Sequence, residues 1–125
     1  MKISEALERI DASKPNTFES GEKIEWMARL DARIHSEIIM THEHKPEDET
    51  FTAYSAETDG NTELLAEYPY DNLYIYYLES QIDYYNGEMA KYNNSAAMFN
   101  NAYAEYANYI NRKKMPLTKA EMRYF

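Results

Sequence analysis

Between residues 75 and 110, large apolar or small residues recur at steps that alternate between three and four. They are Ile75, Leu78, Ile82, Tyr85, Met89, Tyr92, Ala96, Phe99, Tyr103, Tyr106 and Ile110. This spacing averages 3.5 residues, and only a helix gathers such positions on one side. The pattern predicts one long helix over about 71–114, and we call its apolar side the heptad seam. A helix of this length would span roughly 60 Å, so part of it is expected to need a partner.

The predicted long helix carries start and stop signals at its ends. Asp71 is a good N-cap residue. Three basic residues suit the negative end of the helix dipole: Arg112, Lys113 and Lys114. Pro116 disfavours helix at the residue before it. Gly87 lies off the seam and should cost a helix only about 1 kcal/mol, so the helix is expected to continue through it.

Two shorter helices are predicted before this stretch. The first places Ile3, Leu7 and Ile10 on one side and is ended by Pro15. The second runs over about 21–40, and its inner stripe consists of Ile24, Met27, Leu30, Ile34 and Ile38.

Residues 41–70 lack helical periodicity and form an acidic excursion. Phe51, Ala53 and Ser55 alternate with their neighbours, and an Asp-Gly pair at residues 59–60 is a turn signal, so a small β-hairpin is predicted here. In the tail, residues 115–125, Thr118 and Glu121 have capping-box spacing and predict a short helix over 119–124. The expected fold is a single all-α domain over residues 1–125.

The net charge of −9 is distributed unevenly along the chain. Residues 41–67 carry eight acids and one lysine, whereas residues 86–125 carry six bases and three acids. The two segments either attract each other between copies of the chain or form ordinary solvated surfaces. So acidic a chain is not expected to bind nucleic acid in a sequence-specific way. No apolar run approaches the length of a membrane span.

No residue pattern in the chain indicates catalysis. His42 and His44 flank Glu43, and His35 lies one predicted element earlier, but H-x-H spacing is a weak zinc signal and no metal is expected. The chain contains no cysteine and has neither a nucleophile motif nor a phosphate-binding glycine loop. A carboxylate pair at Glu79 and Asp83 has no further site member, so neither an enzyme nor a cofactor is expected.

Tyrosine and asparagine residues instead suggest an interaction surface. The chain has thirteen tyrosines, and asparagines repeat by sevens in two adjacent rows over residues 86–108. Tyrosine favours interfaces but also lines helical cores. Asparagine rows either fix register by hydrogen bonding or form an uncharged solvated face. The candidate interface residues are Tyr70, Tyr77, Tyr84, Asn93, Asn100, Lys113, Lys114, Lys119, Tyr124 and Phe125.

The run YDNLYIYYLESQIDYYNGEMAKYNNSAAMFNNAYAEYANYINRKKMP, residues 70–116, resembles a class of small prophage proteins of the virion-assembly cluster. It is similar to head–tail connector (adaptor) proteins of tailed phages. The resemblance implies a mostly helical subunit without catalytic residues, which forms a homo-oligomeric ring, commonly of about twelve copies. The ring would dock under the portal and contact tail components. Such a protein would be found in the host cytoplasm during assembly and then in the virion.

A second interpretation of the sequence does not involve a phage particle. The chain could be a non-catalytic helical interaction module, such as a dimeric scaffold or regulator, that acts through the heptad seam. A dimer with two-fold symmetry uses the same patch on both copies, whereas a ring uses two different patches. The sequence leaves both readings open.

Overall fold

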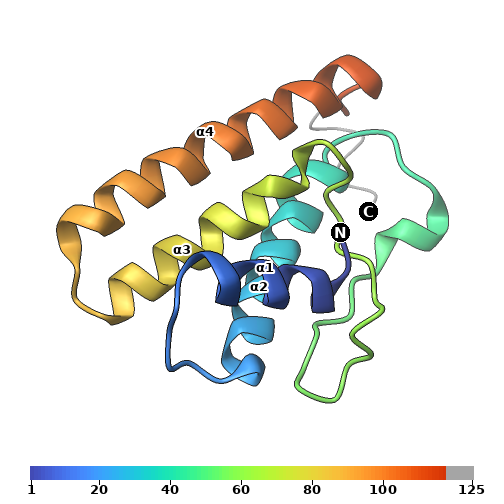
Figure 1. Ribbon diagram of the computed structural model, residues 1–125. Helices are drawn as coiled ribbons and strands as arrows, with labels where there is room; N and C mark the ends of the chain where they lie inside the picture. The colour runs from blue at the N-terminus through green and yellow to red at the C-terminus, as the bar shows by residue number, and fades with distance from the viewer. Residues whose placement is uncertain (118–125) are drawn as a thin grey trace.

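The computed structural model describes residues 1–117 and is built from helices. Within these residues the α-helices are α1 (Ile3–Ser13), α2 (Ser20–Ile34), α3 (Leu73–Tyr85) and α4 (Met89–Lys113). Helix α3 lies at the centre, with α4 antiparallel along one side of it and α1 and α2 on the other (Figure 1). The all-α prediction is thereby confirmed. The predicted helix over 119–124 lies outside the described residues.

The prediction of one unbroken helix over 71–114 is wrong, because the chain turns back at Gly87. Gly87 has φ +72°, a left-handed conformation that glycine adopts without steric cost. Its N–H donates to the carbonyl of Tyr84 at 3.1 Å, and the N–H of Glu88 donates to the carbonyl of Asp83 at 3.0 Å. These two bonds form a Schellman motif, which ends α3. Helix α4 begins at Met89, four residues after the last residue of α3, and runs in the opposite direction (Figure 1).

Substitution of Gly87 should measure the contribution of this turn. A Cβ atom at this position would meet no other atom within 4 Å, so the cost of Gly87→Ala comes from the backbone conformation alone. We expect Gly87→Ala to lower the free energy of unfolding by about 1 kcal/mol. Gly87→Asn should cost less, because asparagine tolerates the left-handed region. Urea unfolding of both variants checks this order, and equal stability of Gly87→Ala and the wild type would contradict the turn.

The heptad seam is buried inside one chain because the turn folds it onto itself. Leu78, Ile82 and Phe99 are buried, and the ring centroids of Phe99 and Tyr77 lie 5.1 Å apart across the two helices. The seam positions that flank the turn differ: Tyr85 is 54% exposed and Met89 is 52% exposed. The heptad spacing predicts that both residues are buried, but neither is buried within the single chain.

The two N-terminal helices pack as their apolar patterns predict. The stripe of α2 is buried, and α1 buries Ile3 and Ile10 and packs Leu7 at the edge of the core. Helix α2 ends at Ile34 and continues as one π-helical turn, η1 (His35–Ile39). Together they cover nearly all of the predicted range of 21–40.

The predicted β-hairpin in the acidic excursion does not form in the part of the chain that the structure describes. Its return segment pairs with the N-terminus instead: the N–H of Ile3 donates to the carbonyl of Thr62, and the N–H of Leu64 to that of Met1. The segment contains only a short 3-10 turn, η2 (Pro46–Glu49). A further 3-10 turn, η3 (Tyr70–Asn72), precedes α3, so Asp71 lies within this turn rather than at the predicted N-cap.

Candidate interaction surfaces

Asp31 is the most enclosed carboxylate of the fold, and it joins three segments. Its two oxygens accept hydrogen bonds from the hydroxyl of Tyr74 at 2.6 Å, the hydroxyl of Tyr54 at 2.7 Å and the N–H of Leu65 at 3.1 Å. The Tyr74 hydroxyl in turn accepts from the N–H of Ala66. Burial raises the pKa of Asp31, while its hydrogen-bond donors oppose that shift. The cluster holds the acidic excursion against α2 and α3, which is a structural role.

A second buried carboxylate, Asp83, is also fully engaged. Lys14 donates to it at 2.5 Å, and the hydroxyl of Ser95 donates at 2.9 Å, so it ties α1 and α4 to the end of α3. Burial raises the pKa of its neighbour Glu79. Because Asp83 is only 1% exposed, the pair does not form an open acid–base site.

The three histidines are used by the fold rather than gathered around a common point. His42 is buried between the carbonyl of Ile38 and the side-chain oxygen of Asn111, at 2.7 and 2.6 Å. His35 contacts the carbonyl of Asp48 at 2.7 Å, and His44 contacts the carbonyl of His42. Within residues 1–117, no three side chains of the metal-binding types come together as a site.

The predicted interface tyrosines occupy different environments. Tyr70 stacks on Tyr109 of α4 at 4.5 Å, and Tyr77 packs between α3 and α4, so both help to join these helices. Tyr84 is 51% exposed at the turn end of α3, where it contacts Tyr92. Of the three, only Tyr84 offers most of its ring to solvent.

The predicted asparagines Asn93 and Asn100 both lie on the exposed side of α4. That side carries a further seven-residue pattern of small and uncharged residues, all of them exposed. We call it the α4 outer row, and it consists of Ala90, Asn94, Ala97, Asn101, Ala104, Asn108 and Asn111. Between Lys91 and Glu105 no residue of α4 is charged.

The basic end of α4 meets the acidic excursion of its own chain. Lys113 pairs with Glu67 at 3.1 Å, and the strand-like residues that follow α4 bond to residues 41–43. The hydrogen bond to Glu67 raises the pKa of Lys113. Lys114 is half-buried beside these contacts. The three other candidate residues lie outside the described part of the chain: Lys119, Tyr124 and Phe125. The basic end of α4 and the acidic excursion, which could attract each other between copies, thus form at least one ion pair within a single chain.

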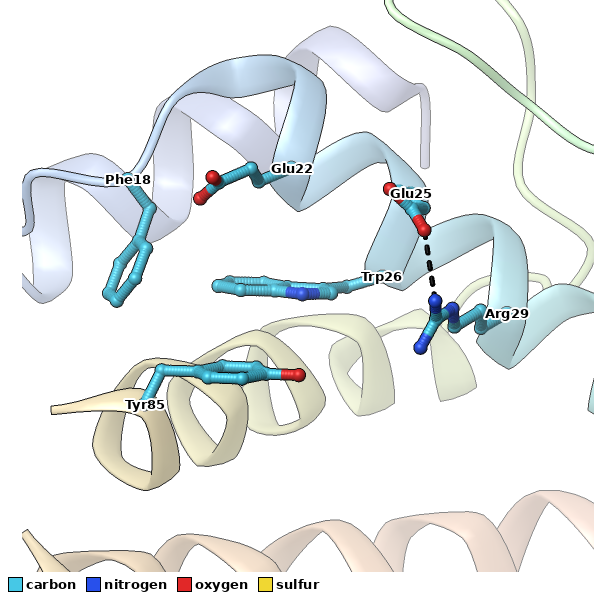
Figure 2. Close-up of a pocket in the computed structure, with 6 residues that line it drawn as sticks. All are labelled: Phe18, Glu22, Glu25, Trp26, Arg29 and Tyr85. Carbon is cyan, nitrogen blue, oxygen red and sulfur yellow. Dashed lines mark hydrogen bonds and ion pairs between the residues drawn. The ribbon is translucent and has the colours of Figure 1, made fainter. Parts of the chain in front are cut away.

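One surface that the sequence did not indicate lies between α2 and the end of α3. It is a groove of about 290 Å³ lined by aromatic and charged side chains, and we call it the aromatic groove. Its lining residues, labelled in Figure 2, are Phe18, Glu22, Glu25, Trp26, Arg29 and Tyr85. The rings of Trp26 and Tyr85 stack in parallel with their centroids 5.5 Å apart, although the two residues are far apart in the chain.

Comparison of the chain with known protein families, with curated proteins and with solved structures finds no match. Residues 1–117 contain no helix that is long and apolar enough to cross a membrane.

Proposed function

We propose that the chain is a non-catalytic structural subunit of phage assembly, a head–tail connector that joins copies of itself into a ring. The observation that carries the proposal is the outward side of α4. This helix has 25 residues and is about 37 Å long. Its inner side packs on α3, and its outer side presents the α4 outer row to solvent.

The composition of the α4 outer row is unusual for a solvated helix surface. Such a surface generally carries lysine and glutamate, which favour helix and solubility. Asparagine costs a helix up to about 0.7 kcal/mol relative to alanine. Alanine lets another backbone approach closely, and the asparagine side chain both donates and accepts hydrogen bonds. An uncharged row of alanine and asparagine residues is therefore suited to contact with another protein surface.

The packing of the heptad seam also bears on the choice between the two readings. A dimeric scaffold or regulator acting through the seam needs this seam to be accessible. Leu78, Ile82 and Phe99 are buried within the single chain, so the seam offers little surface to a second copy. The resemblance of residues 70–116 to connector proteins then favours a phage assembly role, with the portal and tail components as further partners.

Charges introduced into the α4 outer row test this proposal. The double variant Ala97→Glu/Ala104→Glu should keep its helical circular dichroism, because both sites are exposed and glutamate is a good helix former. It should lose assembly by about tenfold or more, since two carboxylates would be desolvated at each contact. Light scattering and native mass spectrometry, with and without the portal protein, provide the measurement.

The matched control places the same two changes elsewhere on the helical surface. Ala12 on α1 and Ala32 on α2 are also exposed, so Ala12→Glu/Ala32→Glu adds the same charge away from α4. This control should assemble like the wild type. Normal assembly of the α4 variant would show that the α4 outer row is not a contact surface.

A further inference from the structure

The aromatic groove is built by three rings that hold one another in place. The Phe18 ring meets the Trp26 ring edge-on at 5.4 Å, and the Trp26 and Tyr85 planes differ by only 5°. Trp26 is 8% exposed and forms the inner wall, whereas Tyr85 is 54% exposed and leaves much of its ring accessible. The faces of aromatic rings carry negative electrostatic potential and attract cations within about 6 Å.

The charged residues of the groove add to this negative potential. Glu25 pairs with Arg29 at 3.0 Å, so these two charges balance each other at one end. The side-chain carboxylate of Glu22 has no hydrogen-bond or ion-pair partner within the described part of the chain, which leaves the groove one net negative charge. Figure 2 shows the Glu22 carboxylate directed toward the space between Phe18 and the indole of Trp26.

We propose that the aromatic groove binds a lysine or arginine side chain presented by a partner protein. Figure 2 shows the Glu22 carboxylate and the Tyr85 ring on opposite faces of the Trp26 indole. The aliphatic stem of such a side chain can cross the edge of the indole from the exposed ring of Tyr85, so that its cationic group reaches the Glu22 carboxylate. A volume of about 290 Å³ lies at the small end of ligand pockets and suits one long side chain. An anion would face Glu22 and the negative ring faces, and a neutral apolar group would leave Glu22 desolvated without a partner. This site is separate from the α4 outer row and does not depend on the connector proposal.

Trp26 is the only tryptophan in the chain, so its fluorescence reports on this groove alone. The full-length protein is titrated with short acetylated peptide amides that differ only in a central arginine, lysine, glutamine or glutamate. We expect the arginine and lysine peptides to change Trp26 emission in a saturable way. They should bind about tenfold or more tightly than the glutamine peptide, and the glutamate peptide should bind least. Added salt should weaken the binding, because Glu22 is exposed.

Two variants and their controls identify the groups involved. Glu22→Gln should weaken arginine-peptide binding about fivefold or more, whereas Glu88→Gln, an exposed glutamate outside the groove lining, should leave it unchanged. Tyr85→Leu removes the ring face and should weaken binding, whereas Tyr85→Phe should retain it. The proposal is overturned if the glutamine peptide binds as well as the arginine peptide, if Glu22→Gln has no effect, or if no peptide gives a saturable signal.

Discussion

Replacement of Phe99 by alanine should lower the free energy of unfolding by about 3–5 kcal/mol. Phe99 is 5% exposed, and its ring lies 5.1 Å from Tyr77 and 5.8 Å from Tyr103, centroid to centroid. The substitution would leave a cavity between α3 and α4 that the surrounding rings fill only partly. Urea unfolding at constant pH, followed by circular dichroism, gives the difference between the variant and the wild type.

The neighbouring residue supplies the control for Phe99. Met98 is 43% exposed on the same turn of α4, so Met98→Ala should change the free energy of unfolding by less than about 0.5 kcal/mol. A loss below about 0.5 kcal/mol for Phe99→Ala would show that Phe99 is not a core residue. Such a result would contradict the packing of α4 against α3 through Phe99.

Replacement of Asp31 by alanine should cost about 2–4 kcal/mol. It leaves the hydroxyls of Tyr74 and Tyr54 and the N–H of Leu65 without their acceptor. Tyr74 is fully buried and cannot turn to water, so its hydroxyl should account for much of the loss. Tyr54→Phe removes a single bond at the edge of the cluster and should cost clearly less. Equal losses for the two variants would contradict the arrangement around Asp31.

The pH dependence gives an independent test of the same carboxyl group. Burial raises the pKa of Asp31 above its ordinary value, so the folded chain holds a proton at pH values where the unfolded chain has lost it. The contribution of Asp31 to the free energy of unfolding therefore falls as the pH rises from its ordinary pKa to the raised one. The wild type should lose stability relative to Asp31→Asn across this window. Parallel stability curves for the two proteins above about pH 4 would contradict a raised pKa.

The apolar pattern was sufficient to predict the helices and most of the core. Ile34, Leu78 and Phe99, for example, are buried as their spacing requires. The pattern could not show that the long helix folds back at Gly87, because both arms of a helical hairpin need an apolar side and the seam keeps its phase through the turn. Periodicity specifies which side of a helix is buried and not what covers it. The Asn-Gly pair at residues 86–87 was the available signal, since such pairs often end helices.

The polar and aromatic clusters depend on contacts that the sequence pattern does not encode. Asp31 bonds to Tyr54 and Tyr74, which lie 23 and 43 residues away and belong to a loop and to another helix. Trp26 falls beside the predicted stripe of α2 and meets Tyr85 only because α3 ends there. The exposure of Tyr85 likewise follows from the turn. Sites of this kind require the tertiary arrangement, whereas Asn93 and Asn100 could be placed on one helix face from their spacing alone.

The mass of the complex that the chain forms with the portal protein encoded nearest to it tests the connector proposal most directly. Native mass spectrometry of the co-purified proteins should show a closed ring of the chain with one fixed copy number on each portal ring. The Ala97→Glu/Ala104→Glu variant should be absent from that complex. A chain that stays free of the portal at high concentration, or that is found only as a salt-independent dimer, would contradict the proposal.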